Sequence, residues 1–115
     1  MENKVEIQDG QLIVVPQGVT KLAAVKDEII VPLDHVVGAS IDTGILNDRK
    51  GLKMPGTAMP GYWAGSFHKD SEITFFNVKQ SSTPIVIQLK DDKYSRLVLG
   101  TENPRNLVEL INNAI

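Results

Sequence analysis

Short runs of β-branched and other apolar residues, each ended by a turn signal, constrain this chain more than any other feature of its sequence. The first run alternates apolar and polar residues from Lys4 to Gln8, which is typical of a half-buried strand. Asp9-Gly10 follows, and this pair favours a two-residue hairpin turn because both positions accept positive φ. Gln11 to Val15 supplies the returning strand, so the chain is predicted to open with a β-hairpin.

Further short apolar runs predict more strands, mostly antiparallel, which are joined by polar or proline-containing turns. They are Glu28–Val31, Val36–Ile41, Tyr62–His68, Glu72–Val78, Pro84–Lys90 and Tyr94–Leu99. Residues 18–26 show helical spacing instead and predict a short extra helix. Residues 43–61 are rich in glycine and contain two prolines, which predicts a long loop of the kind that is often functional.

The end of the chain carries the clearest helix signal. Asn103 suits the N-cap, and Pro104 suits the first helical position because its missing N–H is not needed there. Apolar residues then recur at helical spacing and form one face. They are Leu107, Val108, Leu110, Ile111 and Ala114. We therefore predict a C-terminal helix over residues 103–113.

These elements together predict a mainly β fold in one domain, since 115 residues match the length of a single domain. Seven or eight strands followed by one helix favour a bent antiparallel barrel or sandwich. The helix, through Leu107, Leu110 and Ile111, would cap its open end and so cover strand edges that would otherwise stay unpaired.

Composition and charge exclude several classes of function. The formal net charge of −2 does not suit a nucleic-acid-binding domain, and the absence of cysteine excludes disulfides, thiol catalysis and zinc fingers. The two histidines, His35 and His68, have no converging ligands in the sequence, so we expect neither a metal nor a cofactor. The polar N-terminal residues and the lack of a long apolar run predict a cytoplasmic protein.

Three stretches that cover most of the chain resemble the pleckstrin-homology-like (PH-like) fold, in particular bacterial PH-domain families of uncharacterised proteins. They are LIVVPQGVTKLAAVKDEIIVPLDHVVG from Leu12, GLKMPGTAMPGYWAGSF from Gly51 and YSRLVLGTENPRNLVELINNAI from Tyr94. The resemblance implies a PH-like fold and a bacterial source, and it implies no established activity. The first hairpin loop, Asp9-Gly10, lacks paired basic residues, so phosphoinositide specificity is not implied.

The sharpest enzymatic signal is Asp42-Thr43-Gly44, a tripeptide that aspartic peptidases use. In those enzymes two aspartates share a proton and activate water, so a chain of this length would have to dimerise. Residues 97–100 before the helix resemble a second element of retroviral-type peptidases, whereas Ile45 stands where those enzymes carry a small residue. The preferred interpretation is an ordinary turn at a strand end, and hence no enzyme.

A candidate contact surface lies around residues 49–63. Arg49, Lys50 and Lys53 form a small basic cluster that suits anionic lipid headgroups or an acidic partner. Four soft or aromatic residues accompany it, and such residues favour either adaptable interfaces or a core. They are Met54, Met59, Tyr62 and Trp63.

The sequence therefore predicts a non-enzymatic module that binds a protein partner or its own copies, through loop 49–63 or through an exposed sheet edge. The first alternative is a homodimeric aspartic peptidase that acts through Asp42. A weaker alternative is peripheral lipid contact through the basic cluster. Binding to nucleic acid is not expected.

Overall fold

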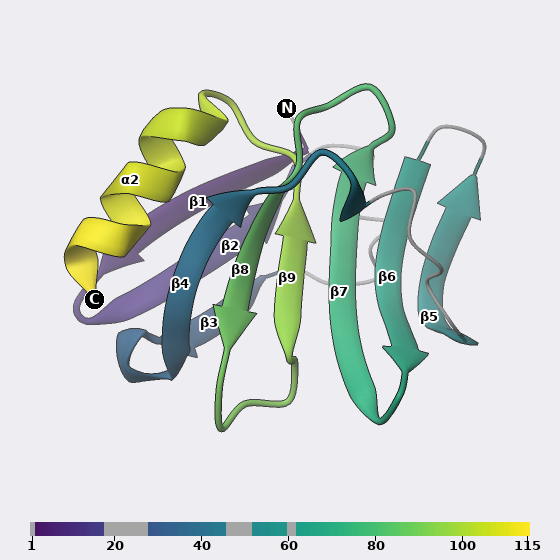
Figure 1. The fold of residues 1–115 in the computed structure, drawn as a ribbon, viewed down its shortest axis with the longest axis horizontal. Coiled ribbons are helices and arrows are strands. Elements are labelled where there is room, and N and C mark those ends of the chain that lie inside the picture. Colours follow the sequence, from purple (N-terminus) through teal and green to yellow (C-terminus); the bar gives the residue numbers. More distant parts are fainter. Residues whose placement is uncertain (1, 18–27, 46–51, 60–61) are drawn as a thin grey trace.

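The computed structural model describes residues 2–17, 28–45, 52–59 and 62–115, and for residues 52–59 it describes the backbone only. Its strands form one sheet of three and one sheet of six, and a single helix follows them (Figure 1). The prediction of a mainly β chain with a C-terminal helix is confirmed. The described strands do not close into a barrel, because each sheet ends in two separate edge strands.

The first sheet comprises β1 (Asn3–Gln8), β2 (Gln11–Pro16) and β3 (Ile29–Pro32), all antiparallel and in chain order. Asp9 and Gly10 join β1 to β2 with φ values of 53° and 74°. These positive values are those of the two-residue turn that the sequence predicts. The predicted helix at residues 18–26 lies outside the described residues.

A short 3-10 turn, η1 (Leu33–His35), leads from β3 into the second sheet. That sheet has the order β4-β8-β9-β7-β6-β5. Its strands are β4 (Val36–Ile41), β5 (Leu52–Met59), β6 (Tyr62–Lys69), β7 (Glu72–Lys79), β8 (Ile85–Leu89) and β9 (Arg96–Leu99). All neighbours are antiparallel except β7 and β9, which run parallel, so the carboxyl ends of these two strands lie side by side.

The strand β5 corrects the prediction of a loop over residues 43–61. It pairs with β6, and the pairing register shifts between Lys53 and Gly56, on either side of Pro55. Proline and irregular pairing are tolerated at a sheet edge, and β5 is an edge strand of its sheet. The glycine and proline content that predicted a loop is thus compatible with a bulged edge strand.

The main core lies between the two sheets, where alternate apolar residues of both sheets meet those of the helix. Its most buried members are Leu12, Val14, Val31, Ala64, Phe75, Ile85, Ile87, Leu97, Leu99 and Ile111. A second cluster lies on the other face of the six-stranded sheet and comprises Phe67, Phe76, Val78, Val86 and Val98. The central strands are therefore apolar on both faces, which explains their nearly continuous apolar sequence.

The helix α2 (Pro104–Ala114) begins and ends close to the predicted positions. Asn103 precedes it in the left-handed region, with φ 52°, and its side chain makes no capping hydrogen bond. The helix buries Leu107 and Ile111, whereas Leu110 is 54% exposed and Ala114 is also exposed. The predicted apolar face is therefore too wide.

The position of α2 also differs from a cap on a barrel end. The helix packs beside the edge strand β4 (Figure 1). There the Asn112 side chain accepts a hydrogen bond from Ala39 N and donates one to Ala39 O, both at 2.8 Å. An amide side chain thereby takes the place of a neighbouring strand at Ala39, and α2 covers this edge.

Buried amides tie the start of β1 to the carboxyl ends of β7 and β9. Asn3 Nδ2 donates to the backbone oxygens of Asn77 at 2.8 Å and of Gly100 at 2.9 Å. Asn77 Nδ2 donates in return to Asn3 Oδ1 at 2.8 Å and to Glu2 O at 3.3 Å. The Tyr62 hydroxyl donates to Asn77 Oδ1. Both asparagines are almost fully buried, so these bonds fix how the two sheets meet.

The Glu2 carboxylate extends the same network. It accepts hydrogen bonds from Lys79 N at 2.8 Å and from Ser82 Oγ at 2.7 Å. The carboxylate lies so close to Gly100 that a Cβ added there would overlap it. A side chain at position 100 would therefore displace the Glu2 carboxylate from these two hydrogen bonds.

Replacing Asn77 by alanine should lower the free energy of unfolding by about 2–4 kcal/mol, because the change removes three side-chain hydrogen bonds inside the protein. Chemical denaturation measures this effect. Gln88→Ala, at the one exposed position of β8, is the control, and we expect it to stay within about 0.5 kcal/mol of the unchanged chain. Equal stability of the two variants would contradict the assigned role of the network.

Candidate functional site

The contact surface predicted around residues 49–63 falls only partly within the described residues. It comprises Arg49, Lys50, Lys53, Met54, Met59, Tyr62 and Trp63. Arg49 and Lys50 lie outside the described residues. Lys53, Met54 and Met59 lie on β5, of which the backbone alone is described. Tyr62 and Trp63 are described with their side chains.

Tyr62 and Trp63 point to opposite faces of the six-stranded sheet. Tyr62 is 8% exposed and belongs to the core between the sheets. Trp63 is half-buried on the other face, where its ring meets Phe67 edge-on at 6.2 Å and its Nε1 donates to Gln80 Oε1 at 3.1 Å. The two aromatic residues therefore do not form one docking surface, because neighbouring residues of a strand alternate between faces.

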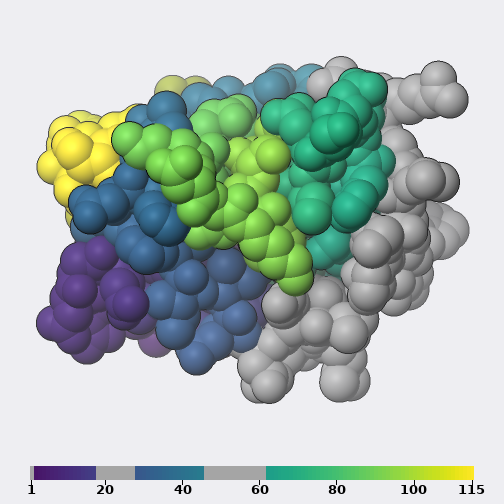
Figure 2. Space-filling view, turned by 90° about the horizontal axis from the view of Figure 1, so that it is seen from below, coloured from purple at the N-terminus to yellow at the C-terminus, as the bar shows by residue number. Residues whose placement is uncertain are grey.

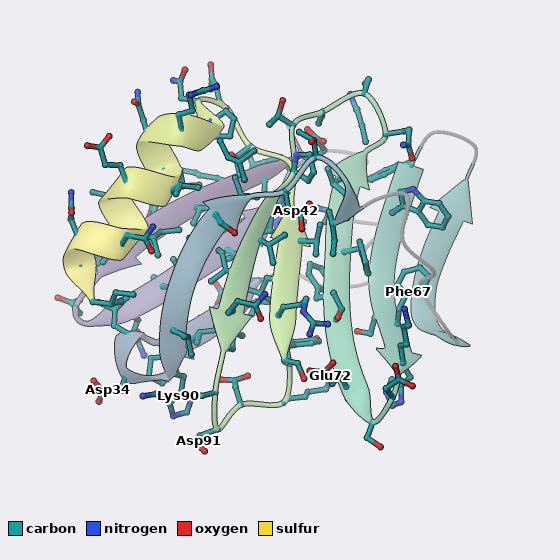
Figure 3. All side chains as sticks on the ribbon, in the orientation of Figure 1. Asp34, Asp42, Phe67, Glu72, Lys90 and Asp91 are labelled. Carbon is teal, nitrogen blue, oxygen red and sulfur yellow. The ribbon has the colours of Figure 1, made fainter. Side chains whose placement is uncertain are left out.

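Asp42 occupies an exposed turn after β4, as Figure 3 shows. Its Oδ1 accepts a hydrogen bond from Gly44 N at 3.0 Å, and its backbone oxygen accepts one from Ile45 N at 3.3 Å. This is the geometry of a turn stabilised by an aspartate side chain, the interpretation that the sequence favours.

His35 has a carboxylate partner that the sequence does not reveal. Its Nδ1 lies 3.1 Å from Asp92 Oδ2, and the two residues are 57 positions apart in the chain. The neighbouring Lys90 N also donates to His35 O at 2.8 Å. Among the described residues, no three histidines, cysteines or carboxylates lie together in a way that could hold a metal ion. The pair therefore fastens η1 to the β8–β9 connection.

The edge strands of the two sheets differ in how far their outward backbone groups are covered or bonded by other parts of the chain. The helix α2 packs along the β4 edge, and its Asn112 bonds both backbone groups of Ala39 there. The β3 edge is only four residues long and ends in Pro32, which cannot donate to another strand. The β1 edge spans six residues, and within the described part of the chain β1 pairs only with β2.

The hydrogen-bonding pattern of β1 shows which backbone groups its open edge presents. Gln17 N donates to Glu2 O at 3.0 Å, so Glu2 faces β2 with its backbone groups. In an antiparallel pair every second residue does the same, so the backbone groups of Lys4 and Glu6 also bond β2. The backbone groups of Asn3, Val5 and Ile7 consequently point away from β2. They form a row of donors and acceptors on the outer edge of the sheet.

A groove runs beside this edge, between β1 and α2. Its volume is about 270 Å³. Its lining includes Asn3, Lys4 and Val5 on the strand side and Asn106, Leu107 and Leu110 on the helix side. Figure 1 shows α2 beside β1, and Figure 2 shows the β1–β2 hairpin as one corner of the molecule on the same side as α2.

This edge and groove can bind an extended chain. The row of backbone groups supplies main-chain hydrogen bonds, while the groove receives the side chains that point towards α2. The exposed Leu110 offers apolar contact area there. The side chains of Lys4 and Glu6 are exposed, and Lys4 Nζ lies 3.0 Å from Glu6 Oε1.

Comparison of the chain with protein-family models, with curated proteins and with solved structures found no match. Within the described part of the chain, no helix has the length and apolar character needed to cross a membrane.

In dilute protein, the amide protons of Val5 and Ile7 should exchange with solvent at least about tenfold faster than those of Lys4 and Glu6. The reason is that only the latter two donate to β2. Hydrogen exchange followed by NMR measures the four rates. Val15, which lies opposite Lys4 on β2, is the protected reference. Slow exchange at Val5 and Ile7 with fast exchange at Lys4 and Glu6 would show that the edge is assigned to the wrong side of β1.

Proposed function

We propose that this chain is a non-enzymatic protein-binding module that adds an extended protein segment to the edge of β1. The observation that carries this proposal is a six-residue edge that pairs with no other strand among the described residues, next to a groove bounded by α2. The sequence predicts binding through loop 49–63 or through a sheet edge, and the described residues favour the edge.

Two sources of affinity are available to such a segment. Antiparallel pairing with Asn3, Val5 and Ile7 supplies backbone hydrogen bonds that do not depend on the sequence of the partner. The apolar surface of Leu110, which is 54% exposed, favours a partner with an apolar side chain at the position that faces α2. The preferred partner is therefore an extended segment of alternating character.

The PH-like assignment remains part of this proposal. The opening hairpin, the mainly β fold and the C-terminal helix support it. The parallel pairing of β7 with β9 departs from the antiparallel strands that the resemblance implies. A bacterial source and a cytoplasmic location likewise stay predictions.

The two alternative functions also stay predictions. A dimeric peptidase requires two copies of Asp42 to meet, and the Asp42 carboxylate already accepts a hydrogen bond from Gly44 N. Cleavage of a peptide library at acidic pH, abolished by Asp42→Asn, would support the peptidase in place of a binding module. Binding to anionic vesicles that weakens with salt would support lipid contact through the basic cluster.

Selection from a displayed library of random ten-residue peptides tests the proposed function. Peptides selected on the unchanged chain should bind Leu110→Glu at least about tenfold more weakly, because a charge would enter the groove. Val5→Pro should weaken binding similarly, since it removes an edge-facing N–H and leaves the ladder with β2 intact. Titration calorimetry measures the dissociation constants, and circular dichroism confirms folding of each variant.

Val37→Glu is the matched control, because Val37 is 57% exposed and lies on the second sheet, outside the groove. We expect it to bind the selected peptides as the unchanged chain does. The proposed function would be wrong if no peptide were selected, or if the selected peptides bound the Leu110 and Val5 variants unchanged.

A further inference from the structure

The exposed face of β1 is complementary to itself in charge. Lys4 and Glu6 stand on either side of Val5, and their side chains are 60% and 46% exposed. A strand that runs antiparallel to β1 and has the same sequence presents its glutamate where β1 has its lysine. We propose that the segment bound at the β1 edge is β1 of a second copy, with Val5 opposite Val5. This inference rests on the proposed function and names its partner.

The hydrogen-bonding pattern allows this pairing. The outward backbone groups of β1 belong to Asn3, Val5 and Ile7, and antiparallel pairing joins outward groups to outward groups. With Val5 opposite Val5, Asn3 of each copy lies opposite Ile7 of the other. All three positions are then hydrogen-bonded pairs, so the six-residue edge is used along most of its length.

The charges select this register over its neighbours. Centring the pair on Lys4 would place two lysines opposite each other, and centring it on Glu6 would place two glutamates opposite each other. Centring it on Ile7 would pair Glu6 with Gln8. Only the register centred on Val5 places Lys4 of each copy opposite Glu6 of the other. Like charges directly opposite each other on paired strands are destabilising, whereas unlike charges are stabilising.

The two charge pairs also fall at favourable positions. Because Val5 forms a hydrogen-bonded pair, Lys4 and Glu6 fall at the non-hydrogen-bonded pairs, where opposite side chains lie closest. Each Lys4 would then contact Glu6 of its own strand and Glu6 of the second copy, so four charges form one alternating array. On the other face, Val5 of the incoming strand points towards the groove beside Leu110.

The resulting assembly has two-fold symmetry and is closed. The strand order across the interface is β3-β2-β1 followed by β1-β2-β3 of the second copy, a continuous six-stranded sheet. Each copy uses the same surface, so the contact cannot propagate into a fibre. A dimer of twice the 12.6 kDa monomer mass is therefore the expected end state.

A charge-reversal series tests the inference by light scattering after size exclusion, over a wide range of protein concentration. The unchanged chain should shift from monomer to dimer as its concentration rises. Lys4→Glu and Glu6→Lys should each weaken the dimer about tenfold or more, because each places like charges together at two positions. The double variant Lys4→Glu/Glu6→Lys restores unlike pairs and should dimerise almost as the unchanged chain does.

Lys90→Glu is the matched control for Lys4→Glu. It makes the same change of charge at an exposed position on the β8–β9 connection (Figure 3). It should leave the dimer unchanged. In the unchanged chain, hydrogen exchange at Val5 and Ile7 should slow as the concentration rises, which would locate the contact on β1.

Three results would overturn the inference. They are a monomer at every concentration, single variants that dimerise as the unchanged chain does, and a double variant no tighter than the singles. None of them decides the proposed function, because the peptide selection tests the β1 edge without requiring a second copy. A monomer that binds selected peptides would retain the binding module and remove only the second copy as its partner.

Discussion

The hydrogen bonds between Asn3 and Asn77 decide how this chain presents β1. Both amides are almost fully buried, and a buried amide that loses its partners is costly. Asn3 must therefore point towards the second sheet, and the strand alternation then turns Val5 and Ile7 inward and Lys4 and Glu6 outward. The same network sets which face of β1 is charged. A shift of β1 by one residue would expose Asn3 and bury Lys4, so the network also protects the register.

The helix α2 gives the two edges on its side of the molecule opposite properties. Its Asn112 hydrogen-bonds both backbone groups of Ala39, and the helix covers the β4 edge. Two residues earlier on the same helix, Leu110 remains exposed beside the β1 edge and lines the groove there. The Asn112 amide replaces the bonds of a missing strand at Ala39, whereas the Leu110 side chain offers only apolar contact area beside β1. Within the described part of the chain, the helix thus accounts for the different surroundings of the β4 edge and the β1 edge.

The sequence predicts local structure well because its signals are local. Asp9-Gly10 predicts the first turn, and Asn103-Pro104 predicts where the helix begins, although the Asn103 side chain does not cap it. The loop prediction failed at β5 because Pro55 is compatible with an irregular edge strand. The contacts of His35 and the open edge of β1 depend on pairings between distant segments, which alternation and spacing do not encode. The charge pattern around Val5 is visible in the sequence, but it has meaning only once β1 is known to be an edge.

An open edge of this kind exposes a protein to uncontrolled association, and charged residues are one means of limiting it. On β1 the charges of Lys4 and Glu6 disfavour strands that bring like charge opposite them, and they favour one register of pairing. A foreign strand with a lysine opposite Lys4, or a glutamate opposite Glu6, meets like charge, whereas β1 of a second copy meets unlike charge at both positions. If copies pair in this way, protein concentration decides how much of the edge is free for another partner, because self-pairing and partner binding use the same backbone groups. The strength of the self-contact is then the property that sets how tightly a competing segment must bind.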